Sequence, residues 1–147
     1  MAITKRGKML AVHRLTRLCR GIVYYSKSHE YLNYSAETKV GRLGLTHFAQ
    51  DQLGDIVHLD LPEANKALAK GQVLGVVESV KTVADVYSPV SGRVLRVNDL
   101  LKKQPELVNT SPEAEGWLAD IAVEKPEELA DLLGKEAYAQ LCEKEKH

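Results

Sequence analysis

Residues 76–97 read VVESVKTVADVYSPVSGRVLRV, and this stretch decides the fold. Two valine-rich runs, 73–80 and 83–87, are separated by almost nothing, which predicts two antiparallel strands. The tight turn between them is expected at 79–82. In the resulting hairpin the opposed pairs are Val76 with Asp85, Val77 with Ala84, and Glu78 with Val83, and Val77 and Ala84 pack inward together.

Lys81 falls at the tip of this hairpin, where its side chain can leave the surface freely. A lysine in that position is ordinarily a solvated charge that keeps a sheet edge from aggregating. A second turn at 89–92 returns the chain to the sheet. Lys81 is therefore expected at the end of a β-hairpin. Only the sequence around it can indicate whether it has a role beyond that of a surface charge.

Short β-like runs broken by turns continue on both sides of the hairpin. Glycines at 41 and 44 mark close approaches of the chain within a β-like run over 40–45. Thr46 is expected to cap one short helix that Gly54 ends. Further strands are expected over 55–60, 92–98 and 116–123.

The period of the sequence changes from about residue 126, where two helices are expected. Pro126 and the acids after it suit a first helical turn, and Gly134 is expected to end that helix. A second helix from Lys135 places Ala137, Tyr138, Leu141 and Cys142 on one stripe, with Cys142 as a small core residue. The fold class is therefore α+β and mainly β, a sandwich or flattened barrel with peripheral helices.

Size and composition narrow the function further. The chain has 147 residues, of which 44% are hydrophobic, so one ordinary domain with a packed core is expected. No apolar run approaches the roughly 18 residues of a membrane-spanning helix. Two cysteines without a CxxC pair, and histidines without ligand spacing, predict no metal site. A binding module, a carrier or a small enzyme remains.

The neutral net charge hides an asymmetric distribution. Residues 1–28 hold seven Lys or Arg and no acid, whereas 29–147 hold 13 basic and 20 acidic residues. We interpret residues 1–22 as a basic amphipathic leader, with 23–147 as one domain that includes the C-terminal helices from about 126. This pattern predicts a mitochondrial transit peptide and a matrix location. A disordered basic tail, a non-native extension before Met9 and a nucleic-acid-binding arm are the alternatives.

Several sequence blocks together carry a family resemblance. The first set is Glu78-Ser79-Val80-Lys81, then Asp85-Val86, then SPVSG at 88–92. Others are His29-Glu30-Tyr31, GLTHFAQ at 44–50, LGDIV at 53–57 and LPE at 61–63. Blocks at 105–109, 111–112 and 116–118 are similar to closing strands. The whole set, over about residues 23–143, resembles the glycine cleavage system H-protein family.

The resemblance implies a lipoyl/biotinyl-type flattened β-barrel of two antiparallel sheets, with a short internal helix and C-terminal helices. It implies that Lys81 carries lipoate through an amide bond and that the chain is a carrier rather than an enzyme. Glu30 and Asp85 match positions that line a cleft for the loaded arm, where acids can hold its ammonium. Two departures occur, Tyr31 in place of Trp and His47 in place of Asp, and the second bears on docking or cleft detail.

The same resemblance implies the partners. They are a pyridoxal-phosphate glycine decarboxylase, a tetrahydrofolate-dependent aminomethyltransferase, a dihydrolipoyl dehydrogenase, and a lipoate ligase or lipoyltransferase. No nucleic-acid or membrane partner is expected. Without a long hydrophobic stripe, the chain is expected to be a monomer.

Two alternatives retain Lys81 as the modified residue. One is a lipoyl or biotinyl domain of another complex, although such domains commonly show DKA or MKM where this chain has VKT at 80–82. The other is an H-like protein that relays lipoyl groups to other enzymes. A small enzyme has no support, because the sequence shows no Ser/His/Asp or Cys/His constellation and no phosphate-binding glycine loop.

Overall fold

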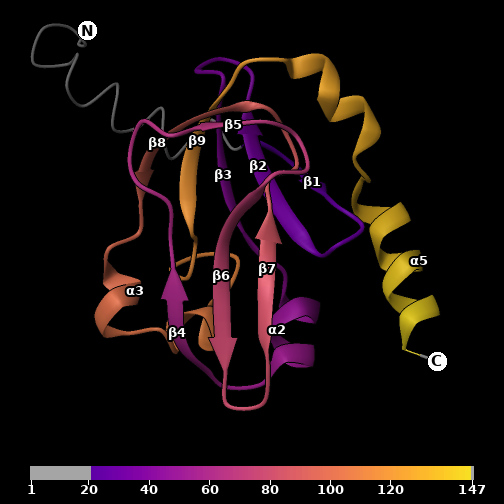
Figure 1. The fold of residues 1–147 in the computed structure, drawn as a ribbon. Coiled ribbons are helices and arrows are strands. Elements are labelled where there is room, and N and C mark those ends of the chain that lie inside the picture. The colour runs from indigo at the N-terminus through magenta and orange to yellow at the C-terminus, as the bar shows by residue number, and fades with distance from the viewer. Residues whose placement is uncertain (1–20, 147) are drawn as a thin grey trace, which may run out of the picture.

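Two antiparallel sheets form the body of the protein (Figure 1), whose computed structural model describes residues 21–146. The larger sheet has the order β1-β2-β3-β9-β8-β5 and the smaller one the order β4-β6-β7. The strands of the larger sheet are β1 (Ile22–Tyr25), β2 (Glu30–Ser35), β3 (Val40–Leu45), β9 (Ala119–Val123), β8 (Gly92–Val97) and β5 (Ala67–Leu68). Those of the smaller sheet are β4 (Ile56–Asp60), β6 (Val73–Ser79) and β7 (Val83–Tyr87).

The predicted mainly β fold of two antiparallel sheets is confirmed, although the sheets do not close into a barrel. Within residues 21–146, no strand of one sheet pairs with a strand of the other. Aliphatic side chains from both sheets form a shared core, which explains why so few aromatic residues suffice. Its fully buried members include Leu32, Leu43, Val77, Val86, Val94 and Ile121.

The central hairpin has the predicted register. Val76 pairs with Asp85, Val77 with Ala84, and Glu78 with Val83. Val77 is buried, while Ala84 is only half-buried. The hairpin extends to one end of the molecule in Figure 1, with α2 beside it.

Two glycines of β3 allow the close approach that the sequence predicts. A Cβ added to Gly41 would lie 2.6 Å from Leu32 Cδ1, and one added to Gly44 would lie 2.5 Å from the Tyr31 hydroxyl. Leu32 and Tyr31 belong to the neighbouring strand β2, so the glycines make room for larger cross-strand partners. Tyr31 also donates a hydrogen bond to the Pro112 carbonyl, at 3.0 Å.

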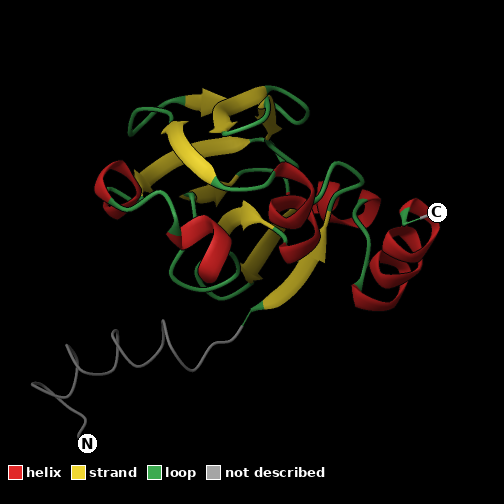
Figure 2. Ribbon diagram, turned by 90° about the horizontal axis from the view of Figure 1, so that it is seen from below, coloured by secondary structure: helices red, strands yellow, loops and turns green. Residues whose placement is uncertain are grey.

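The short internal helix α2 (His47–Leu53) begins and ends as predicted. The Thr46 hydroxyl accepts a hydrogen bond from the Ala49 N–H, and Gly54 ends the helix with φ +85°. In Figure 2 the C-terminal helix lies at the edge of the body that the strands and the other helices form. No helix among residues 21–146 is long and apolar enough to span a membrane.

The expectation that 105–112 belongs to closing strands is wrong. This segment contains α4 (Leu107–Thr110), preceded by α3 (Leu100–Lys103), and only β9 is a strand in this part of the chain. Pro105 has a fixed φ and no N–H to give to a ladder, which favours a helical first turn over a strand. Val108 is the buried residue of α4.

The C-terminal segment differs from the expected pair of α-helices. Pro126–Asp131 forms the 3₁₀ helix η1, and Gly134 caps the start of α5 (Lys135–Glu145). Tyr138 is the buried residue of α5 and stacks on Tyr25, at 4.4 Å between ring centres. Cys142 is half-buried, so its assignment to the core is wrong, because this short helix contacts the sheet mainly through Tyr138.

Candidate functional site

The Lys81 tip has a fixed backbone and an exposed side chain. The buried Ser79 hydroxyl accepts hydrogen bonds from the backbone N–H groups of Lys81 (3.2 Å) and Thr82 (3.1 Å). The Ser79 N–H in turn donates to the Thr82 carbonyl at 2.8 Å. Ser79 thus fixes the backbone on both sides of the tip. The position of a serine just before a turn is a sequence signal for such side-chain-to-backbone bonds, and it could have indicated this role.

The turn after α2 supports this tip from the side. The Val80 N–H donates to the Asp55 carbonyl at 2.9 Å. A Cβ added to Gly54 would lie 3.3 Å from Lys81 Cε, so the lysine stem passes along this glycine. Gly54 therefore has two roles: it ends the helix, and its lack of a side chain leaves room for the aliphatic part of the Lys81 side chain.

Asn109 on α4 holds the same turn in place. Its side-chain oxygen accepts from the Ile56 N–H at 2.8 Å, and its side-chain nitrogen donates to the Gly54 carbonyl at 2.9 Å. The nitrogen also donates to Gln50 at 2.9 Å. Sequence reasoning missed this role of Asn109, because its partners lie more than 50 residues away in the chain.

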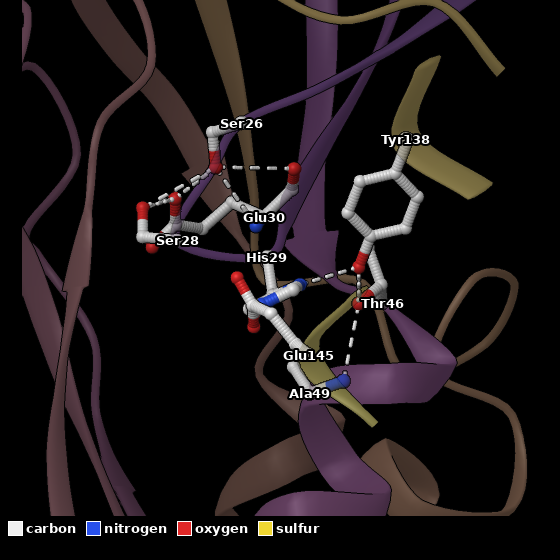
Figure 3. A network of polar contacts seen from close by, with 8 residues as sticks. All are labelled: Ser26, Ser28, His29, Glu30, Thr46, Ala49, Tyr138 and Glu145. Carbon is white, nitrogen blue, oxygen red and sulfur yellow. Dashed lines mark hydrogen bonds and ion pairs between the residues drawn. The ribbon is translucent and has the colours of Figure 1, made fainter. Parts of the chain in front are cut away.

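Glu30 is buried, with 1% of its surface exposed. Its Oε1 accepts hydrogen bonds from the hydroxyls of Ser26 and Ser28, the latter at 2.6 Å (Figure 3). Its Oε2 accepts from the Tyr87 backbone N–H at 3.0 Å. Within residues 21–146, Glu30 takes part in no ion pair. A buried carboxylate held by neutral donors alone is unusual, since buried charges are normally paired.

Asp85 lies on β7, two residues closer to the Lys81 tip than Tyr87. Its side chain is exposed, and in the described part of the chain its carboxylate forms no hydrogen bond or ion pair. The structure does not bring Asp85 and Glu30 into contact with each other. Asp85 is part of β7, whereas Glu30 belongs to β2 and contacts only the last residue of β7, Tyr87. β7 spans roughly 13 Å from Val83 to Tyr87 at 3.3 Å per residue.

His29, the neighbour of Glu30, ties the site to the C-terminal helix (Figure 3). It has φ 72°, and its Nδ1 and Nε2 lie 2.7 Å from the Tyr138 hydroxyl and from Glu145, respectively. The Tyr138 hydroxyl also lies 2.7 Å from Thr46, the cap of α2. Burial raises the pKa of Tyr138 well above its ordinary value, so the phenol keeps its proton. Sequence reasoning placed Tyr138 in the core but missed this polar role.

His47, which stands where the resembled family has Asp, is exposed. Its backbone N–H donates to Glu113 at 3.0 Å, and its ring lies 3.2 Å from the Gln50 amide nitrogen. Among the described residues, no group of three or more His, Cys, Asp or Glu could hold a metal ion. The side chains that the sequence predicts for this site therefore provide one exposed amine, from Lys81, and two carboxylates, from Glu30 and Asp85.

Known proteins share this chain's sequence and fold. Residues 23–145 match the sequence profile described as Glycine cleavage H-protein. The Glycine cleavage system H protein of Thermotoga maritima is 47% identical over 121 residues, which cover 82% of this chain and 96% of that protein. A Schizosaccharomyces pombe protein named Putative glycine cleavage system H protein, mitochondrial, is 43% identical over 122 residues, covering 83% of this chain and 71% of that protein.

A solved structure agrees with these sequence matches. The crystal structure of a glycine cleavage system H protein from Mycobacterium marinum aligns with a TM-score of 0.71 at 32% identity, covering 82% of this chain and 95% of that one. The profile match includes the Lys81 hairpin and extends over most of the chain. The chain therefore belongs to the glycine cleavage H-protein family.

Proposed function

We propose that Lys81 is the lipoyl attachment site through which this chain performs the work of its family. H-proteins are lipoyl carriers of the glycine cleavage system, and family membership gives this chain the carrier role. The attachment residue and the residues that receive the loaded arm are our assignment. The main support for this assignment is the buried Glu30 carboxylate, which has no cationic partner in the described residues. Glu30 lies next to Tyr87, the last residue of β7, and β7 begins beside Lys81.

The surroundings of Lys81 fit a covalently attached arm. The amine is exposed at a turn whose backbone is fixed by Ser79, so a modifying enzyme can reach it without unfolding the hairpin. When bound, lipoate supplies a strained ring disulfide that is readily reduced and can carry a substrate fragment. Acylation removes the lysine charge, and the aliphatic part of the Lys81 side chain can remain packed along Gly54.

Glu30 and Asp85 have complementary parts in this proposal. The exposed Asp85 attracts a primary ammonium to the free edge of β7. Glu30 accepts three hydrogen bonds from protein groups, and a carboxylate has room for about four. The remaining acceptor position would take the ammonium, which would supply the missing positive charge and exclude water from the end of the arm.

The partners follow from the same proposal. A pyridoxal-phosphate glycine decarboxylase would load the arm, a tetrahydrofolate-dependent aminomethyltransferase would unload it, and dihydrolipoyl dehydrogenase would restore the disulfide. A lipoate ligase or lipoyltransferase would modify Lys81. The chain itself would act without catalysing a step, as a monomer that meets each partner transiently.

We also propose a mitochondrial matrix location for the protein. The family profile starts at residue 23, so the basic leader over 1–22 precedes the matched part. A relative with a mitochondrial name, from Schizosaccharomyces pombe, supports this location, while the Thermotoga maritima relative is bacterial. Residues 1–20 of this leader lie outside the described residues, so its proposed amphipathic character depends on the sequence pattern alone.

The intact mass of the protein isolated from its own organism tests the attachment proposal. One spectrum separates lipoyl, octanoyl, biotinyl and unmodified forms, and fragmentation places the added group on a residue. We expect a lipoyl mass on the fragment that contains Lys81. A biotinyl mass, an unmodified chain, or a lipoyl group on another lysine would contradict the proposal.

A further inference from the structure

Two arginines and the single tryptophan of the chain form a cluster on the larger sheet. Arg42 on β3 and Arg96 on β8 both pair with Asp120 on β9, which lies between them. Arg42 forms two hydrogen bonds to Asp120, at 2.8 and 3.0 Å, whereas Arg96 forms one through Nε, at 2.7 Å. The guanidinium carbon of Arg42 lies 4.0 Å from the centre of the Trp117 ring.

This cluster carries more positive charge than its own carboxylates neutralise. Asp120 is buried and faces both guanidiniums, so one negative charge serves two positive ones. Lys102 and Lys103 lie nearby on α3, where Lys102 pairs with Asp99 at 3.6 Å. The excess is notable because residues 21–146 hold 14 Lys or Arg and 20 Asp or Glu, a net charge of −6. A local basic patch on an acidic body indicates an anionic partner.

A hollow of about 580 Å³ opens over this cluster. Its lining includes basic groups from Arg42, Arg96 and Lys103 and apolar surface from Leu100 and Trp117. The Asp99 carboxylate also lines the hollow, and it pairs with Lys102. The Arg96 side chain is 63% exposed, and in the described part of the chain its terminal Nη groups form no hydrogen bond. Leu100 is 57% exposed, so it offers apolar surface to a partner beside the hollow.

We infer that this surface, formed by Arg42, Arg96, Leu100, Lys103 and Trp117, binds a short acidic segment of a partner protein. A carboxylate of that segment pairs with the free edge of Arg96 and with Lys103, while an adjacent apolar side chain covers Leu100 and the indole ring. A long polyanion such as a nucleic acid fits less well, because the body around the patch is acidic. The surface is formed by the larger sheet, α3 and the loop that holds Trp117, whereas the Lys81 hairpin belongs to the smaller sheet, so a partner bound here need not cover the hairpin.

Trp117 makes the inference testable, because its fluorescence is the only tryptophan signal of the chain. The full-length protein is titrated with a capped pentapeptide of alternating Glu and Leu, and with the same peptide carrying Lys in place of Glu. We expect the acidic peptide to change the Trp117 emission in a saturable way and the basic peptide to have no effect. Raising the salt concentration should weaken binding, because exposed ion pairs are screened.

Two variants and one matched control locate the binding. Arg96→Gln and Lys103→Gln should each weaken the acidic peptide about two- to fivefold, the range for single exposed ion pairs. Arg96→Gln keeps both Arg42–Asp120 bonds, so its circular dichroism spectrum should be unchanged. Arg93→Gln is the control, since Arg93 is an exposed arginine of the same strand that bonds the Asn65 carbonyl outside the hollow.

Four results would each overturn the inference. The first is no change in Trp117 emission on adding the acidic peptide, and the second is an equal change on adding the basic peptide. The third is an unchanged affinity for the acidic peptide in both Arg96→Gln and Lys103→Gln. The fourth is tighter binding of a single-stranded oligonucleotide than of the acidic peptide. The last result would reassign the patch to nucleic acid. None of these measurements depends on lipoylation, so their failure is separable from failure of the attachment proposal.

Discussion

Glu30 and Tyr87 join the two sheets through one hydrogen bond, from the Tyr87 backbone N–H to Glu30 Oε2 at 3.0 Å. Glu30 begins β2, and Tyr87 ends β7, the edge strand of the smaller sheet. The carboxylate thus satisfies a backbone donor that has no neighbouring strand on that side. In our proposal Glu30 also receives the loaded arm, so tests of its binding role must be separated from its structural role.

The first prediction concerns attachment at Lys81. Lys81→Arg keeps the charge but offers a guanidinium that cannot form the lipoyl amide. The fold should persist, because the side chain is exposed at the tip. We expect no lipoyl mass after incubation with a lipoate ligase, lipoate and ATP, and no turnover in a reconstituted glycine decarboxylation assay. A lipoyl mass that survives the change would assign the site to another lysine.

The second prediction concerns the clamp beneath the tip. Ser79→Ala removes the acceptor of two backbone N–H groups, so it should destabilise the protein by about 1 kcal/mol and loosen the turn. Hydrogen exchange at Lys81 and Thr82 should become faster, and lipoylation slower. Thr38→Ala, a change at an exposed position in the β2–β3 turn, serves as the control and should affect neither. Unchanged exchange at Lys81 in Ser79→Ala would show that the strand pairing alone fixes the tip.

The third prediction concerns Tyr138 and pH. Its pKa is raised by burial, so the unfolded chain loses this proton near pH 10 while the folded chain keeps it. The associated stability is complete below pH 10 and falls as the pH rises further. Tyr138→Phe should cost about 1 kcal/mol at pH 7, through its lost bonds to His29 and Thr46. Urea unfolding between pH 8 and pH 11 should show the gap to the unaltered protein narrowing; a constant gap would contradict the assignment.

Patterns local to the chain were predictable from the sequence. The hairpin register follows from alternating apolar residues on both sides of a two-residue tip, and the same short-range logic finds the Thr46 cap and the Gly54 stop. Each of these features depends on residues within about ten positions of each other. The placement of Lys81 at an exposed tip follows from them.

Features that depend on distant contacts were not predictable from pattern. The burial of Glu30 contradicts the ordinary exposure of acids, and it depends on Tyr87 from the other sheet. Asn109 acts through partners on α2 and β4, which its local sequence does not indicate. The half-burial of Cys142 reflects how a short helix docks through one tyrosine, and periodicity alone does not give the depth of docking.

The fourth prediction concerns the leader. Residues 1–28 fused to a fluorescent reporter should direct it to mitochondria, because the segment combines an apolar stripe with arginines and no acid. Changing Arg14, Arg17 and Arg20 to Glu should abolish import. A cytosolic signal from the unaltered fusion would mean that the segment is a tail without targeting function.

The last prediction concerns the proposed arm site and separates its two acids. A charge-assisted hydrogen bond contributes about 1.5–3 kcal/mol, so removing one from the loaded arm should speed its spontaneous decay by roughly tenfold or more. Asp85→Asn should do this without loss of stability, because Asp85 has no partner in the described residues. Glu30→Gln should also speed decay, but with a stability loss of about 1–3 kcal/mol, because an amide cannot accept all three of the bonds that Glu30 accepts.

The protein is loaded enzymatically, the decarboxylase is removed, and the arm is followed by mass. Asp60→Asn is the matched control, since Asp60 is an exposed acid on β4, at the opposite edge of the same sheet. Its decay rate should equal that of the unaltered protein. The double variant should be less than additive if both acids hold the same ammonium. Reduction of the oxidised arm by dihydrolipoyl dehydrogenase should be unchanged in Asp85→Asn, because that arm carries no cation. Equal decay rates in the unaltered protein, Asp85→Asn and Glu30→Gln would contradict the proposed arm site. Asp85 would then be an ordinary surface charge, and Glu30 would only connect the two sheets.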